Sequence, residues 1–313
     1  MNSVKTFQYL KDERMRLDVF LLAELNNLSR AAIQKNIISG NVWVNEKTIK
    51  INHFFLKNGD RVEWQEPKIT QLSTIQVDNA ILALPNINII DQIDNYVVIE
   101  KPTALLAHAT ANKPNQPSLI DWLLKNFPQA RQIGEDPLRP ALVHRLDKDV
   151  SGLMVIPLNQ NYYDHLKQQF KLRKVDKEYL GLVHGQFSAP SGEIDLPITR
   201  SKNTGKMAAR SHQQGGKKSL TSYQVIKQYR NYALLSISLH SGRTNQIRVH
   251  FSALGRSLAG DKLYQNKNIT IKNNLSRVFL HAHKVAWPDL DGKIISYESP
   301  LPKELANFLT KLK

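Results

Sequence analysis

A segment near residue 80 divides this chain into a short and a long part. Residues 71–88 carry one charged residue, Asp78, a composition typical of a linker between folded units. The full length of 313 residues exceeds what one hydrophobic core usually organises. We therefore expect a first domain at residues 1–70, a linker at 71–88 and a second domain at 89–313.

The short part has a pattern of helices followed by strands. Apolar residues recur at helical spacing over residues 17–25, and a second helix is expected from Ser29, a suitable N-cap, to Gly40, a suitable stop. Alternating apolar and polar residues predict short strands at 41–45 and 61–64. The short part is thus predicted to be a small α+β unit.

Short apolar runs alternate with modest helical segments along the long part. Strands are expected at residues 96–100, 152–156, 178–185 and 233–239, and helices at 118–127, 161–170 and 244–255. Thr244 is a suitable N-cap, and a last helix is expected after Pro302. The polar, glycine-containing stretch 201–219 predicts a mobile loop. The alternation indicates one mixed α/β or α+β domain.

Basic residues outnumber acidic ones, with 43 Lys and Arg against 27 Asp and Glu and a formal net charge of +16. Such an excess favours a polyanionic partner such as nucleic acid. The excess is local, because residues 161–230 hold 13 basic and 5 acidic residues, whereas residues 71–95 hold 3 Asp and no basic residue. A surface that follows phosphate groups needs this kind of local excess.

The chain contains no cysteine, which excludes disulfides and thiolate metal sites. No run approaches the roughly 20 apolar residues of a membrane-spanning helix, and residues 1–15 lack the apolar core of a signal peptide. We expect a cytoplasmic protein without a membrane partner. Any active site must use carboxylate, hydroxyl or histidine chemistry.

Two apolar runs bracket a short polar loop that holds His144, Arg145, Asp147 and Ser151. Loops held between rigid strands commonly carry catalytic groups. In extended backbone Arg145 and Asp147 project to the same side, and a nearby cation keeps a carboxylate ionised. Considered alone, such a pair is more often a surface ion pair on a turn.

Further short motifs follow in order along the long part. They are Lys101-Pro102 with His108, residues 144–147 with 151–153, residues 177–185, residues 241–250, residues 258–264, and residues 280–282 with 299–302. Their sequences, order and separations resemble those of RluA-type pseudouridine synthases over about residues 89–302. The resemblance implies an α+β catalytic domain with a central mixed, largely antiparallel sheet, flanking helices and a central cleft.

The family's reaction breaks a glycosidic bond to nitrogen, turns the uracil and rejoins it through carbon 5. The resemblance implies that Asp147 is the catalytic carboxylate, that Tyr179 stacks beside the uracil, and that Arg243 pairs with Asp147 and orients it. A carboxylate can serve as nucleophile and as proton acceptor, so one acid suits this reaction. No cofactor, metal or bound nucleotide is implied.

The family pattern also implies which residues contact substrate. A uridine in folded RNA must be extruded before reaction, and Arg145 resembles the family residue that fills the vacated space. Ile247 is expected to form an apolar wall of the uracil pocket. The remaining substrate contacts are expected from His144, Gln246 and Arg248. The sequence departs from the usual family residues at Val150, Ala104 and Asn245, where Thr, Gly and His are common.

The short part resembles the S-four type RNA-binding module, whose second helix and following turn face RNA. Here that surface would present Arg30, Lys35, Asn36 and Lys47. Phosphate contacts are also expected from basic residues of the long part, namely Lys171, Arg173, Lys174, Lys202, Lys206, Arg210, Lys217 and Lys218. Family members with such a module resemble this chain and modify large-subunit ribosomal RNA, so ribosomal RNA is the expected partner. The chain is expected to act as a monomer.

Three other interpretations fit parts of the pattern. A ribosome-assembly factor that binds RNA without chemistry would need the same charge, but intact Asp147, Tyr179 and Arg243 argue against it. A metal-dependent hydrolase could use His281 and His283, although no acid cluster of ligand spacing lies near them. Residues 215–219 resemble part of a phosphate loop but lack its earlier glycine.

Overall fold

The computed structural model of the chain describes residues 4–25, 28, 30–66, 84–108, 116–136, 139–201, 203–266 and 274–313, without the side chains of residues 30 and 31. These residues form two compact units, a small one that includes residues 4–66 and a large one that begins at Leu84. The N-cap expected at Ser29, the phosphate contact expected from Lys202, and most of the linker lie outside the described residues. The domain boundaries therefore stay predictions.

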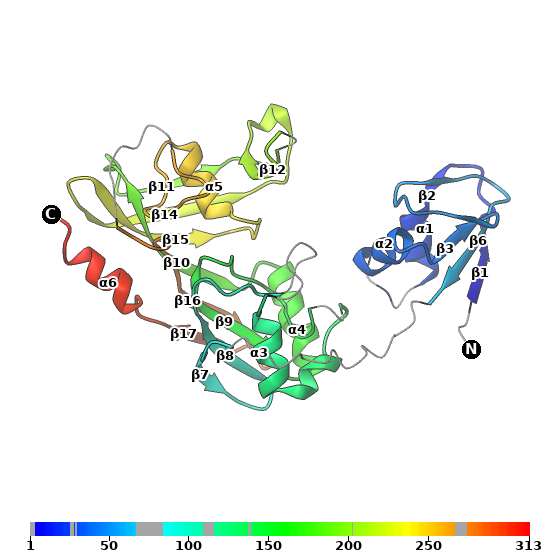
Figure 1. Cartoon of the computed structure of the whole chain (residues 1–313), viewed down its shortest axis with the longest axis horizontal. Helices are drawn as coiled ribbons and strands as arrows, with labels where there is room; N and C mark the ends of the chain where they lie inside the picture. The colour runs from blue at the N-terminus through cyan, green and yellow to red at the C-terminus, as the bar shows by residue number, and fades with distance from the viewer. Residues whose placement is uncertain are drawn as a thin grey trace. The chain divides into compact units, whose positions relative to one another are not determined.

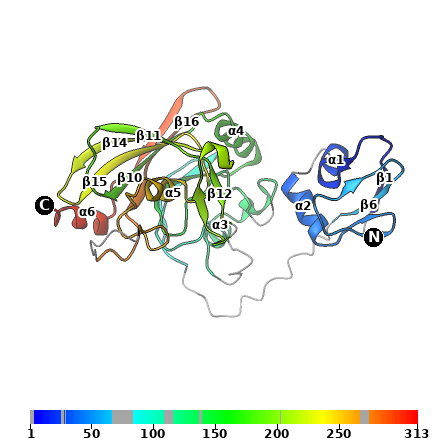
Figure 2. The ribbon, with the colours of Figure 1, turned by 90° about the horizontal axis from the view of Figure 1, so that it is seen from above.

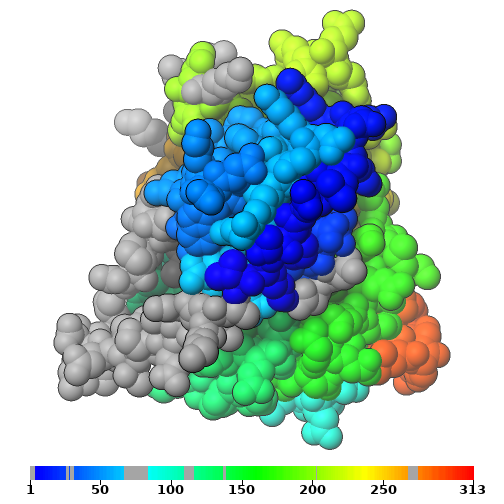
Figure 3. Space-filling model, turned by 90° about the vertical axis from the view of Figure 1, so that its right-hand side faces the viewer, coloured from blue at the N-terminus to red at the C-terminus, as the bar shows by residue number. Residues whose placement is uncertain are grey.

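The small unit packs two helices against short strands. Its elements are β1 (Val4–Gln8), β2 (Met15–Arg16), α1 (Leu17–Glu24), α2 (Arg30–Ile38), β3 (Val42–Val44), β4 (Lys47–Thr48), β5 (Phe55–Leu56) and β6 (Arg61–Gln65). The described strands pair in the order β1-β6-β3-β4, with β2 on β5. The adjacent surfaces of β1 and β6 are visible in Figure 3. Leu21, Ile37 and Trp64 belong to one buried cluster, so the helical and strand periodicities predicted for this unit meet in one core.

One large sheet organises the large unit (Figure 1). Its strands are β7 (Asn88–Gln92), β8 (Tyr96–Lys101), β9 (Ser151–Pro157), β10 (Asp176–His184), β11 (Ser191–Asp195), β14 (Leu220–Gln228), β15 (Tyr232–Leu239), β16 (Leu280–Pro288) and β17 (Ile294–Glu298). Among the described residues the order is β11-β14-β15-β10-β16-β9-β8-β7, with β17 also on β16. The pairs are antiparallel except β9 with β16, which is parallel. The predicted mixed, largely antiparallel α+β fold is confirmed.

Helices cover both faces of this sheet. They are α3 (Leu119–Asn126), η1 (Pro128–Gln132), α4 (Gln160–Lys171), η2 (His212–Gln214), α5 (Gln246–Ala253) and α6 (Lys303–Leu309). On β8, Val97 and Ile99 join the cluster that holds α3 and α5, whereas Tyr96 and Val98 join the cluster that holds α4. Figure 2 shows α4 across the sheet from α3 and α5. The continuous apolar run of β8 thus reflects burial on both faces.

Two local predictions were wrong. Helix α5 is capped at Asn245, in a left-handed conformation with φ of 56°, and not at Thr244. Much of the stretch expected to be a mobile loop is ordered, because β12 (Ile198–Arg200) and β13 (Met207–Ala209) pair as a hairpin and η2 follows it. Polar composition concealed this hairpin, whose backbone hydrogen bonds do not depend on apolar side chains.

Candidate active site

The loop that carries Asp147 leads directly into β9. The Asp147 carbonyl accepts a hydrogen bond from the Val150 amide at 3.1 Å, which closes a tight turn. At the start of β9, Gly152 has φ of 122°, and a Cβ there would lie 2.3 Å from the Ala282 carbonyl oxygen. A glycine is therefore required where β9 meets β16 in parallel. This close approach fixes the position of the loop relative to the sheet.

A second segment, after β8, clamps the same loop. Lys101 is fully buried, and its Nζ donates to the carbonyls of Pro102 at 2.7 Å, Leu105 at 2.9 Å and Lys148 at 3.3 Å. Thr103 Oγ1 donates to the Asp149 carbonyl at 2.9 Å. Burial lowers the pKa of Lys101 to about 7, yet three carbonyl acceptors match the three donors of an ammonium group. The motif residue Lys101 thus holds the backbone on the C-terminal side of Asp147.

Asp147 is a partly exposed carboxylate with mixed surroundings. Burial raises its pKa above the ordinary value, while the positive charges of Arg248, Arg145 and Lys101 and a backbone hydrogen bond from Asn245 lower it. The net pKa shift is upward. A carboxylate that is poorly solvated but surrounded by cations is a better proton acceptor than a free aspartate, and perturbed groups of this kind mark functional sites.

The guanidinium that acts most strongly on Asp147 belongs to Arg248, on α5. Arg248 Nε and Nη2 donate to the two carboxylate oxygens of Asp261, each at 2.8 Å, and Nη1 lies 3.5 Å from Asp149 Oδ2. Burial lowers the Arg248 pKa, but the hydrogen bonds to Asp261 and the negative charge of Asp261 raise it, and the net shift is upward. Such a bidentate pair holds the cation in one orientation.

Arg243, predicted to pair with Asp147, does not do so. Its Nε and Nη2 both donate to the Lys218 carbonyl at 3.2 Å. Arg243 precedes the start of α5, whereas Arg248 lies in that helix. Five residues of separation within one motif therefore direct the two guanidinium groups to different partners. Within this motif, Arg248 is the arginine whose charge lowers the Asp147 pKa. Its side chain is buried against Asp261, and its contact with substrate stays a prediction.

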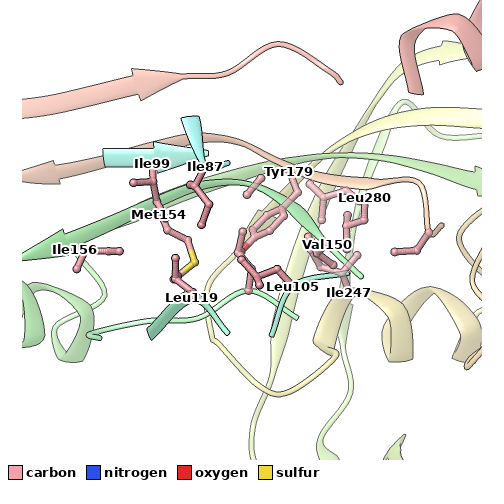
Figure 4. Close-up of a cluster of buried hydrophobic side chains, with 14 of the residues drawn as sticks. Ile87, Ile99, Leu105, Leu119, Val150, Met154, Ile156, Tyr179, Ile247 and Leu280 are labelled. Atoms are coloured by element: carbon pink, nitrogen blue, oxygen red, sulfur yellow. The ribbon is translucent and has the colours of Figure 1, made fainter. Parts of the chain in front are cut away.

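Tyr179 and Ile247 lie in one apolar cluster. Figure 4 shows the Tyr179 ring among Leu105, Val150, Ile247 and Leu280. Burial, followed by the charge of Asp147, raises the pKa of Tyr179, so its hydroxyl stays protonated. The pairing of β10 with β16 shifts between Glu178 and Tyr179, and an irregularity of this kind can re-aim a side chain. The structure thus brings the predicted residues Tyr179 and Ile247 into one apolar cluster, and Tyr179 lies close enough to Asp147 for the carboxylate charge to act on its hydroxyl.

Two residues predicted to bind substrate also have structural contacts. His144 Nε2 accepts a hydrogen bond from the Val155 amide at 3.1 Å, and its ring stacks on Phe170. Burial lowers the His144 pKa to about 3, so the ring is neutral. Gln246 is buried and bonds to Ser241, Thr221 and the backbone of Leu220 and Arg243. Each side chain therefore has hydrogen-bond partners within the protein, and its contact with substrate stays a prediction.

The predicted RNA contacts lie at separate places. Arg145 is exposed, with Nη1 3.5 Å from His108 Nε2. Exposed Lys171 is the last residue of α4, and exposed Arg173 and Lys174 follow it. Exposed Lys206 and partly buried Arg210 flank β13. In the small unit Lys35 is exposed on α2, and the side chain of Arg30 lies outside the described residues. Asn36 is buried and donates to the Gln65 carbonyl at 3.0 Å, so it is not an open RNA contact.

Sequence reasoning did not assign roles to Asn245, Tyr264 and Asp261. When the Asn245 amide is oriented to satisfy both neighbours, Nδ2 donates to Asp147 Oδ2 at 2.7 Å and Oδ1 accepts from the Tyr264 hydroxyl at 3.1 Å. Asp261 was recognised only as part of a motif. The signal that could have found Asn245 was its departure from the usual family residue within a motif that was otherwise intact.

The described part of the chain contains no group of three or more His, Asp or Glu side chains placed to hold a metal ion. His281, considered as a metal ligand, contacts Ser151 Oγ through Nδ1 at 2.9 Å, and His283 Nδ1 contacts the Ser299 carbonyl at 2.6 Å. In the same described ranges, none of the helices is both long and apolar enough to span a bilayer.

Known proteins match both units. A family model described as RNA pseudouridylate synthase matches residues 95–253, and one described as S4 domain matches residues 15–62. An uncharacterized RNA pseudouridine synthase of Aquifex aeolicus is 35% identical, over 85% of this chain and 82% of that protein. A ribosomal large subunit pseudouridine synthase D of Buchnera aphidicola is 32% identical, over 95% of this chain and 94% of that protein. The solved structure titled human RNA Pseudouridylate Synthase Domain Containing 4 has a TM-score of 0.57 and 25% identity, covering 72% of this chain and 94% of that one.

Proposed function

Because the chain belongs to the RNA pseudouridylate synthase family, we propose that Asp147 is the carboxylate that carries out its reaction. The chain is an RNA pseudouridine synthase, an isomerase, and the family inferred from the motifs is confirmed. The observation that supports Asp147 is its setting: a partly exposed carboxylate on a clamped loop, under the charge of Arg248 and beside Tyr179.

This setting suits the chemistry. The bond from N1 of uracil to the sugar breaks and a bond from C5 to the same sugar carbon forms. C5 loses a proton and N1 takes one up, so there is no net redox change or hydrolysis. Asp147 must be ionised to act as nucleophile or as proton acceptor. Burial raises its affinity for a proton, and the surrounding cations keep the ionised form accessible.

The uracil would lie against the apolar group around Tyr179 and Ile247, both of which are buried, with the Tyr179 hydroxyl under the influence of the Asp147 charge. An aromatic ring and a branched aliphatic side chain form a surface on which a base can stack. Arg145 is exposed on the same loop as Asp147. We propose that the Arg145 side chain fills the space left in the RNA by the extruded uridine. There its positive charge can also contact neighbouring phosphates.

Large-subunit ribosomal RNA is the proposed substrate. Several relatives bear the name ribosomal large subunit pseudouridine synthase D, at 28 to 32% identity over at least 95% of this chain. Exposed Lys35 in the small unit, and Lys171, Arg173, Lys174 and Lys206 in the large one, offer cations for its phosphates. A cytoplasmic location and action as a monomer are part of the same proposal.

The test is release of tritium from carbon 5 of uridine in unmodified ribosomal RNA. The wild-type chain should release it, and Asp147→Asn should be at least about a hundredfold slower, as expected for loss of a general base or nucleophile. Asp149→Asn is the matched control, because this carboxylate lies two residues away and only 3.5 Å from Arg248. Release by Asp147→Asn at the wild-type rate, or equal loss in both variants, would refute the assignment.

A further inference from the structure

Asn245 occupies an unusual position at the start of α5. It is the N-cap residue, with φ of 56° and ψ of 25°, and its side chain makes no capping hydrogen bond to the helix. Asparagine is one of the few residues that adopt this left-handed conformation readily, and at N-caps its side chain normally accepts from the first helical amides. The Asn245 amide is therefore directed elsewhere.

The amide bridges two groups of the site. The Asn245 Nδ2 donates to Asp147 Oδ2 at 2.7 Å and lies 3.3 Å from Asp147 Oδ1. The Asn245 Oδ1 accepts from the Tyr264 hydroxyl at 3.1 Å. A donor on a carboxylate favours its ionised form, and a donor of fixed orientation also fixes the carboxylate plane. Because the Tyr264 hydroxyl occupies Oδ1, the NH₂ end of the amide stays toward Asp147.

Tyr264 is held in turn by the ion pair of Arg248 and Asp261. The Asp261 carboxylate accepts from the amides of Leu263 at 2.9 Å and Tyr264 at 3.0 Å, and also binds Arg248. The Arg248 guanidinium lies over the Tyr264 ring at 5.4 Å. Asp261 and Arg248 thus hold Tyr264, whose hydroxyl orients Asn245, and a continuous path joins Asp261 to Asp147.

We propose that Asn245 and Tyr264 are positioning residues that orient the Asp147 carboxylate and hold it ionised in the absence of substrate. The proposal rests on the catalytic role assigned to Asp147. It gives Asn245 the task of a hydrogen-bond donor, which a histidine, the residue usual at this place in the family, can also perform. The pair acts through Asp147 and does not require contact with the uracil.

Variants that preserve the backbone test this role. Asn245→Gly removes the amide and tolerates the left-handed φ, so kcat should fall about tenfold or more, as for loss of a charge-assisted hydrogen bond, with little change in KM. Asn245→Asp cannot donate and adds a negative charge, so its loss should be greater. Asn245→His should recover activity. In the Gly and Asp variants the acidic limb of the pH profile of kcat should move to higher pH.

Tyr264→Phe should lower kcat less than Asn245→Gly, because the amide remains but can rotate. Tyr229→Phe is the matched control, since Tyr229 lies in a separate buried cluster with Phe279, and it should leave both kcat and the pH profile unchanged. Melting temperatures establish that each variant is folded. If Asp147→Asn is inactive while Asn245→Gly and Tyr264→Phe match the wild type in kcat and pH profile, the positioning role is wrong and the catalytic role stands. If Asp147→Asn is active, the proposed function itself fails.

Discussion

Replacing Arg248 with Gln should weaken both the fold and the reaction, and the two losses should be separable. The Asp261 side chain is fully buried, and Arg248 donates to both of its oxygens at 2.8 Å. Removing one partner of a buried ion pair leaves an uncompensated charge and typically costs about 3–5 kcal/mol. Asp261 keeps two backbone donors, from Leu263 and Tyr264, so we expect the lower end, about 3 kcal/mol.

The reaction should slow for a different reason. Among the positive charges that lower the Asp147 pKa, Arg248 has the largest effect. Without it the Asp147 pKa rises further, less of the carboxylate is ionised at neutral pH, and the acidic limb of the pH profile moves up. Loss of one preorganised electrostatic group costs about a hundredfold in kcat. Arg243→Gln is the matched control, because the Arg243 side chain donates to the Lys218 carbonyl and not to Asp147 among the described contacts, and it should change kcat little.

The double variant Arg248→Gln with Asp261→Asn separates the two effects. Two amides can hydrogen bond to each other without a buried charge, so most of the lost unfolding free energy should return. Activity should not return, because the cation near Asp147 is still missing. Urea unfolding followed by tryptophan fluorescence measures the lost unfolding free energy, since Trp122 and Trp287 are buried in the large unit, and tritium release measures activity. Recovery of activity together with stability would show that Arg248 acts only through the fold.

Two further predictions concern the loop and β9. Burial lowers the His144 pKa from 6.5 to about 3, so the unfolded chain binds a proton that the folded chain does not. Stability is then complete above about pH 6.5 and falls as the pH drops toward 3, by about 2 kcal/mol at pH 5. His144→Gln, which can still accept from Val155, should lose less in urea unfolding at pH 5, and equal losses would contradict this account. Gly152→Ala should destabilise by more than about 2 kcal/mol because its Cβ meets Ala282. Gly205→Ala, also at positive φ but with open space, controls for backbone strain alone, and similar melting temperatures would refute the role of the contact.

The sequence by itself determined the family, the α+β class and the positions of most strands and helices. Apolar periodicity is a local property, so the strands around residues 98, 154 and 180 and the helices around 122 and 165 could be located from spacing alone. The loop with Asp147 was recognisable because residues 144–147 and 151–153 match the family's short motif in identity and order. Tyr179 and Ile247 followed from neighbouring motifs, and the structure places both in one apolar cluster, with Tyr179 near the Asp147 charge.

Only the tertiary structure decided which groups meet at that carboxylate. Arg243 and Arg248 lie in one motif, and their roles depend on where α5 begins and on the buried Asp261, which no spacing reveals. Lys101 reaches the backbone of Lys148 across 47 positions, and Asn245 reaches Asp147 only through a left-handed backbone conformation. Periodicity records which face of an element is buried, whereas the partner of a polar side chain is chosen by packing between distant segments. For that reason the chemistry could be predicted, but its positioning required the fold.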